Sequence, residues 1–228
     1  MVVQSVDVAV GSGAFTALEV IGIVACGVSG VIAAARARMD WLGAIVLAVV
    51  VAIGGGTLRD LLLGRLPVVW LETYWPILVA LLTSVVMIIV FRLWPHIDVE
   101  RSRALVIADA AGLSAFVVLG TDIGLQAGIA PVLAVMLGVL TGVGGGVIRD
   151  LLTGVRPMVL TGPVYASAGV AGAVCFLAMS ELGLPPTLDT WTAVLVVFAV
   201  RMLAVRYNWS LPLVEPERKN AGVPEGEQ

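Results

Sequence analysis

The sequence predicts an all-α integral membrane protein with seven transmembrane helices, arranged as two inverted three-helix repeats followed by a seventh helix. Three observations predict this fold. Of the 228 residues, 60% are hydrophobic and only 13% are charged, and the mean hydropathy is +1.06. Apolar windows of the about 20 residues that a helix needs to cross a bilayer cover most of the chain. A motif in the first half of the chain recurs in the second half at a fixed distance.

The first three windows are separated by charged and turn-forming residues. They cover residues 13–35, 41–63 and 75–94. The segment 36–40 contains two arginines and an aspartate, and Leu66 to Thr73 separates the second window from the third. The third window stops at Pro95, which lacks the backbone donor that a helix interior requires. Tryptophans at the window ends, where amphipathic rings favour the membrane interface, support these limits.

The remaining four windows follow the same pattern. They cover residues 103–121, 130–153, 161–180 and 188–207. Thr121 to Gly128, Arg156 to Gly162, and Gly183 to Asp189 separate them. The division of the chain is therefore a first repeat at 13–94, a second at 103–180 and a seventh helix at 188–207. The polar residues 210–228 are expected to form a cytoplasmic tail.

The repeated motif carries three glycines and an Arg-Asp pair. Residues 54–67 recur at 144–157, with nine of fourteen positions identical and no gap. The same spacing relates Glu19 to Asp109. A unit of three spans crosses the membrane an odd number of times, so its second copy must enter from the opposite face. The repeats are therefore predicted to be inverted, as in many transporters.

Basic residues predict the orientation, because lysine and arginine favour the cytoplasmic side. They lie around the ends of the first, third, fifth and seventh windows, at Arg36, Arg38, Arg92, Arg101, Arg103, Arg156, Arg206, Arg218 and Lys219. Arg65, in the second connection, is the exception. This distribution predicts an N-terminus outside the cell and a C-terminus in the cytoplasm.

The glycine triplets indicate the working site. Each glycine costs a helix about 1 kcal/mol relative to alanine, and backbone groups freed in a bilayer are tolerated only inside protein or beside a water-filled cavity. We therefore expect the second and fifth helices to be broken at the triplets and to cross near the bilayer centre. Freed carbonyls would guide cations, and half-helix N-termini would attract anions. Close helix packing is the alternative. The predicted pore glycines are Gly54, Gly55, Gly56, Gly144, Gly145 and Gly146.

The acidic and basic residues near the triplets complete the predicted path. Neighbouring helical residues point about 100° apart, so we expect Arg59 to pair with Asp150 and Arg149 with Asp60, across the pseudo-two-fold axis. These ion pairs would hold the two helices together, take part in permeation, or do both. Glu19 and Asp109, at equivalent positions, would attract cations or serve as solvated or capping groups.

Several function classes find no support in the sequence. The triplet motif lacks the Lys-Ser/Thr of a phosphate-binding loop, and His96 has no partners for a catalytic triad or a metal site. Cys26 and Cys175 are expected to be free thiols. The sequence contains no basic patch of the kind that binds nucleic acid. We therefore expect no enzyme activity, no cofactor, no metal site and no nucleic-acid partner.

The paired triplets followed by Arg-Asp, together with Arg36-Ala-Arg38-Met39-Asp40-Trp41, resemble the prokaryotic trimeric intracellular cation (TRIC) channel family, which includes domains associated with glycine transport. The resemblance covers about residues 14–207. It implies a homotrimer in lipid, in a bacterial-type inner membrane, with a path in each protomer for monovalent cations such as potassium, with sodium as a second candidate. A glycine transporter using the same site is the runner-up, and an assembly protein with purely structural motifs is the third reading.

Overall fold

The structure is a computed structural model that describes residues 13–96, 103–161 and 164–209. Within these ranges the chain forms helices and no strand, as predicted. The helices are α1 (Gly13–Arg36), α2 (Trp41–Leu62), α3 (Val69–Glu72), α4 (Trp75–Leu93), α5 (Ala104–Gln126), α6 (Pro131–Leu152), α7 (Met158–Thr161), α8 (Ala166–Glu181) and α9 (Pro186–Tyr207). The predicted tail at 210–228 lies outside the described residues, as do Arg101, Arg218 and Lys219.

Seven of these helices form the bundle, and six of them are long and apolar enough to cross a membrane. The seventh, α8, has only 16 residues, a length of roughly 24 Å at 1.5 Å per residue. The predicted sixth window at 161–180 is thus divided between α7 and α8, with a short connector between them. The fourth window also differs, because α5 continues to Gln126. Thr121 does not end α5, since its hydroxyl donates to the Val117 carbonyl at 2.8 Å inside the helix.

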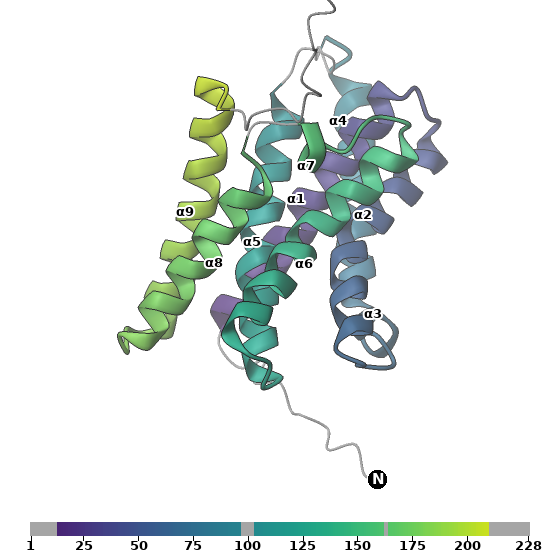
Figure 1. The fold of residues 1–228 in the computed structure, drawn as a ribbon. Coiled ribbons are helices and arrows are strands. Elements are labelled where there is room, and N and C mark those ends of the chain that lie inside the picture. The colour runs from purple at the N-terminus through teal and green to yellow at the C-terminus, as the bar shows by residue number, and fades with distance from the viewer. Residues whose placement is uncertain (1–12, 97–102, 162–163, 210–228) are drawn as a thin grey trace, which may run out of the picture.

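The two three-helix units are inverted, as the odd number of crossings predicts. α1 and α5 run in opposite directions, and the short helices α3 and α7 lie at opposite ends of the bundle (Figure 1). α2 and α6 have 22 residues each and begin ninety residues apart, at Trp41 and Pro131. α9 follows the second unit and has no counterpart in the first.

Matching turns end α2 and α6. Gly64 and Gly154 adopt positive φ values of 66° and 73°, which glycine accepts without the steric cost of a Cβ. The next amide donates back into the helix in each case, from Arg65 to the Asp60 carbonyl and from Val155 to the Asp150 carbonyl, both at 2.9 Å. Each turn directs the chain toward a short helix, α3 after α2 and α7 after α6.

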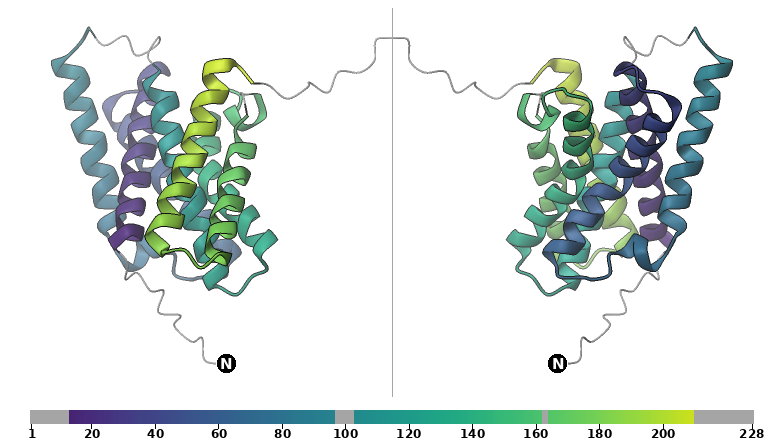
Figure 2. Two further views of the ribbon diagram at one scale, coloured as in Figure 1. Left: turned by 90° about the vertical axis from the view of Figure 1, so that its left-hand side faces the viewer. Right: turned by 90° about the vertical axis from the view of Figure 1, so that its right-hand side faces the viewer.

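α1 and α5 form the centre of the bundle. α5 packs against α1, α6, α8 and α9, whereas α1 also contacts α2 and α4. Figure 2 shows α4 and the α8–α9 pair on the outside of this central pair. Cys26 lies in the α1–α5 contact beside Gly112, and it is free, as is Cys175. The central pair fixes the positions of α2 and α6, which carry the repeated motif.

Candidate functional site

The glycine triplets bring α2 and α6 into direct backbone contact. A Cβ added to Gly55 would overlap the Thr141 carbonyl oxygen, and one added to Gly145 would overlap that of Val51. Gly144 is almost as close, since its Cβ would lie 3.2 Å from the Gly55 Cα. Thr141 and Val51 are themselves ninety residues apart, so the contact is symmetric between the repeats. We call this contact of residues 51, 55, 141 and 145 the crossing.

Both helices continue through their triplets. The expectation that they are broken there is therefore wrong, and close packing is the correct interpretation of the crossing glycines. The physical reason is that the missing side chains let two backbones approach while each helix keeps its own hydrogen bonds. The remaining triplet residues differ in role. Ile148 covers Gly54 at 2.7 Å from the added Cβ, whereas Gly56 and Gly146 face the charged residues that follow.

The first charged group lies at the end of α2, and we call Glu19, Arg59 and Asp60 the first half-site. Arg59 donates to Asp60 Oδ1 from Nε at 2.9 Å and from Nη2 at 2.7 Å. The other Asp60 oxygen accepts from the Val69 amide at 3.2 Å. Arg59 and Asp60 are 5% and 1% exposed. Asp60 thus links an arginine of α2 to the first residue of α3.

The second charged group repeats this arrangement at the end of α6, and we call Asp109, Arg149 and Asp150 the second half-site. Arg149 Nη2 lies 2.8 Å from Asp150 Oδ1, and Asp150 Oδ2 accepts from the Met158 amide at 2.8 Å. Arg149 Nη1 also donates to Asp109 Oδ1 at 2.7 Å and to Ser29 Oγ at 3.2 Å. Every charged member is at least 95% buried.

Each arginine therefore pairs with its own neighbour, and the expected pairs between the repeats do not form. Asp60 and Asp150 lie five residues beyond Gly55 and Gly145, on helices that leave the crossing in opposite directions. At 1.5 Å per residue the half-sites are each roughly 7 Å from the crossing, on opposite sides. An ion pair across that separation is impossible, and the long arginine side chain instead folds onto the adjacent carboxylate.

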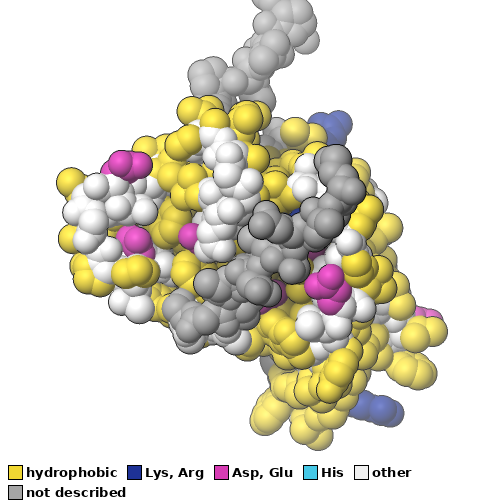
Figure 3. All heavy atoms as spheres, turned by 90° about the horizontal axis from the view of Figure 1, so that it is seen from below, with side chains coloured by type: hydrophobic (Ala, Val, Ile, Leu, Met, Phe, Trp, Pro, Cys, Tyr) yellow, Lys and Arg dark blue, Asp and Glu magenta, His cyan; other side chains and the backbone are white. Residues whose placement is uncertain are grey.

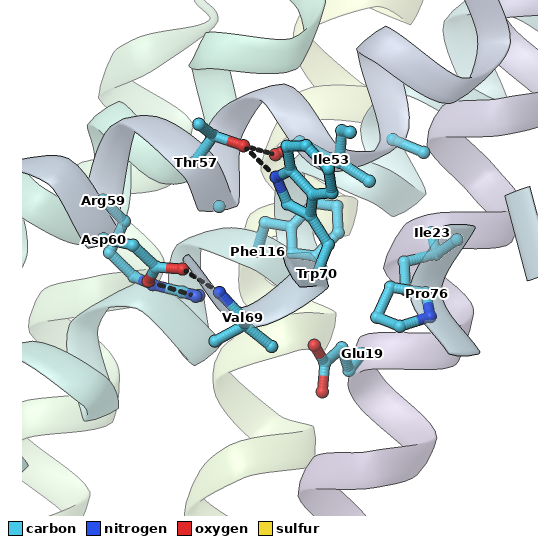
Figure 4. A pocket seen from close by; sticks show the side chains of 12 residues that line it. Glu19, Ile23, Ile53, Thr57, Arg59, Asp60, Val69, Trp70, Pro76 and Phe116 are labelled. Carbon is cyan, nitrogen blue, oxygen red and sulfur yellow. Dashed lines mark hydrogen bonds and ion pairs between the residues drawn. The ribbon is translucent and has the colours of Figure 1, made fainter. Parts of the chain in front are cut away.

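An open pocket lies beside the first half-site (Figure 4). It contains about 370 Å³ of space not filled by atoms, including its open mouth. Trp70 of α3 forms one wall, and its indole donates to Thr57 Oγ1 at 3.0 Å. Glu19 lines the same pocket from α1, facing Arg59 and Asp60 on α2. The Glu19 carboxylate is only partly buried, and among the described residues it forms no hydrogen bond or ion pair.

The second half-site is closed by two residues that the sequence interpretation missed. A Cβ at Gly146 would lie 2.9 Å from the Tyr165 hydroxyl and 3.2 Å from Asp109 Oδ1, whereas one at Gly56 would meet nothing closer than 3.7 Å. The Arg201 guanidinium of α9 covers the Tyr165 ring at 4.5 Å from its centroid. Neither residue belongs to the repeated motif. The available signal was Arg201 itself, a charge set inside an apolar window.

Comparisons with known proteins identify membrane proteins that are similar to this chain over most of its length. The family model described as Glycine transporter matches residues 16–92 and 106–181. The UPF0126 inner membrane protein YadS of Escherichia coli is 36% identical over 196 residues, which are 86% of this chain and 93% of YadS. The UPF0126 membrane protein YvgT of Bacillus subtilis is 35% identical over 201 residues, which are 87% of this chain and 96% of YvgT.

Solved structures of TRIC channels share the fold. The TRIC trimeric intracellular cation channel orthologue from Rhodobacter sphaeroides superposes with a TM-score of 0.80 and 36% identity, over 86% of this chain and all of that one. A second TRIC cation channel superposes with a TM-score of 0.77 and 35% identity, over 89% of this chain and 98% of the other. The chain therefore belongs to the Glycine transporter (UPF0126) family of membrane proteins, which shares its fold with the TRIC channels.

Proposed function

We propose that this protein conducts monovalent cations, with potassium as the main ion and sodium as a second, along a path within each protomer. The path runs from the pocket at the first half-site, past the α2–α6 crossing, to the second half-site. One observation carries the proposal: the inverted repeat places a buried charged group on each side of a single glycine crossing. The TRIC channels with the same fold support the choice of cations.

The charge balance of the first half-site favours cations. With its carboxylates ionised, this half-site holds two negative groups, Glu19 and Asp60, and one positive group, Arg59. Arg59 is paired with Asp60 at 2.7 Å, which leaves the Glu19 charge uncompensated at the mouth of the pocket. An unpaired carboxylate at a pore entrance raises the local concentration of cations and repels anions.

The proposed surroundings of the path are a homotrimer in a bacterial inner membrane, with the N-terminus outside. The solved Rhodobacter relative is described as trimeric, and the Escherichia coli relative as an inner membrane protein. Arginines lie in the last turns of α1, α4 and α9, which all end at the same side of the bundle (Figure 1). The opposite end displays acidic side chains on a largely hydrophobic surface, with basic side chains only toward the edge of the view (Figure 3). By the positive-inside rule, this distribution supports a cytoplasmic position for the arginine end.

Glycine transport is the second candidate, favoured by the description of the matching family model. A pocket open beside one half-site, with the other half-site closed, also suits alternating access in an inverted repeat. The Glu19 carboxylate would hold the ammonium group of the zwitterion. The two candidates differ in kinetics, because a pore passes ions continuously whereas a carrier saturates.

The test is a current measurement on the full chain in planar bilayers, comparing Glu19→Gln with the unaltered protein. A unit charge about 8 Å from the ion contributes about 1 kcal/mol at an effective dielectric constant of about 40, so potassium conductance should fall roughly fivefold at low salt. The loss should shrink at high salt, because mobile ions screen the charge. Glu181→Gln is the control, since Glu181 is the exposed last residue of α8. Equal conductance for both variants at low salt would refute the role of Glu19.

A further inference from the structure

The two half-sites have the same sequence motif but different accessibility. In the first, Gly56 and Thr57 line an open pocket. In the second, the equivalent Gly146 faces the Tyr165 hydroxyl, and Val147 packs against the apolar cluster that includes Tyr165. Position 57 is threonine and position 147 is valine, but the hydroxyl that lies against Gly146 belongs to a residue outside the motif. Tyr165 lies in the connector before α8, and its aromatic ring contacts α9.

α9 supplies the part that has no equivalent in the first repeat. Arg201 is 1% exposed, and its guanidinium carbon lies 4.5 Å from the centroid of the Tyr165 ring. Nη1 donates to the Val164 carbonyl at 3.4 Å, and Nη2 lies 4.0 Å from Met158 Sδ. One side chain of α9 therefore contacts both α7 and the connector that leads into α8.

These contacts hold Tyr165 in place beside the second half-site. Met158 is the first residue of α7, and its amide donates to Asp150 Oδ2. α7 is thus attached to α6 through Asp150, and Val164 and Tyr165 are attached to α9 through Arg201. A cation over an aromatic ring is worth about 0.5–1 kcal/mol at exposed sites and about 2 or more when desolvated. The contact can keep Tyr165 beside Gly146, yet it is weak enough to open.

We propose that Arg201 and Tyr165 form a gate that closes the second half-site, with Arg201 as the residue that positions the tyrosine. Separation of α9 from Val164 and Tyr165 would withdraw the tyrosine hydroxyl from Gly146 and open the second half-site as the first is open. The role of this pair as a gate rests on the proposed conduction path. The closure of the second half-site does not depend on that path, and it can be measured without any transport.

The test uses matched cysteine reporters in a Cys26→Ala, Cys175→Ala background. Thr57→Cys and Val147→Cys occupy equivalent positions in the two repeats. Each reporter is treated in open membrane fragments with a water-soluble, positively charged thiosulfonate, which reaches both membrane faces. We expect the cysteine at 57 to react readily and the one at 147 to react at least about tenfold more slowly, a difference of about 1.4 kcal/mol.

Adding Arg201→Met should then raise the rate at position 147 by at least about tenfold, with little change at position 57. Arg206→Met is the control, because Arg206 lies on the same helix at 5.8 Å from the Tyr207 ring, away from the second half-site. A fast reaction at 147 with Arg201 in place would overturn the proposal. An unchanged slow rate at 147 in a folded Arg201→Met protein would do so as well.

A second variant keeps the test decisive if the Arg201→Met protein does not fold. Arg201→Lys keeps the positive charge but loses the planar group that lies on the ring, so the rate at 147 should still rise severalfold. An unchanged rate in that variant overturns the proposal. Potassium flux is measured on the same samples. Faster labelling without any flux would support the closure and reject cation conduction, so the two failures can be told apart.

Discussion

Alanine at Gly145 should separate α2 from α6. The new methyl group would overlap the Val51 carbonyl oxygen, and a backbone atom inside a helix cannot rotate away as a side-chain tip can. Overpacking of this kind costs about 1–3 kcal/mol. The helix itself gains about 1 kcal/mol from replacing a glycine. The expected net effect is destabilisation of the folded protein by up to about 2 kcal/mol. Transport should also be lost, because the methyl group would force α2 and α6 apart at the crossing.

Gly56→Ala is the matched control in the equivalent triplet. The nearest atom to its Cβ is Arg59 Nη2 at 3.7 Å, an ordinary contact. This variant should therefore gain up to about 1 kcal/mol of helix stability. The assay is thermal unfolding of purified protein in detergent, where about 1 kcal/mol shifts the midpoint by about 2–4 °C in a chain of this length. The unfolding midpoint of the Gly145→Ala protein should lie several degrees below that of the Gly56→Ala protein. Equal midpoints would refute the close crossing.

Two further predictions concern the half-sites. Arg149→Gln should destabilise the protein by about 3–5 kcal/mol, because it leaves the buried Asp109 and Asp150 uncompensated. Arg59→Gln removes the partner of one buried carboxylate only, so its unfolding midpoint should fall less. Equal losses in the two variants would contradict the assignment of these ion pairs. Gly154→Ala should lower the midpoint through strain of roughly 1 kcal/mol at its positive φ of 73°, and an unchanged midpoint would contradict that turn.

The sequence predicts most of the architecture because apolar windows and an odd number of spans per repeat are strong constraints. The same reasoning fails at the triplets. Three adjacent glycines are costly for an isolated helix, which suggested a break. Here the identical feature in α6 meets the one in α2, and the packing of two backbones keeps both helices intact. A single helix contains no information about such a partner.

The charged residues show the same limit. The repeat singled out Arg59, Asp60, Arg149 and Asp150, which are all buried. It could not assign their partners, because the direction in which each helix leaves the crossing depends on tertiary structure. The short helices that bind the two aspartates were too brief to produce a periodic pattern. Arg201 was missed because a search for repeated positions finds only residues that have a counterpart.

The most direct test of the central claim measures potassium flux and glycine uptake on the same reconstituted vesicles. We predict a sustained potassium current that continues at fixed voltage and rises with potassium concentration, with no glycine accumulation above that in protein-free vesicles. Saturable glycine uptake in vesicles whose bilayers carry no potassium current would contradict it.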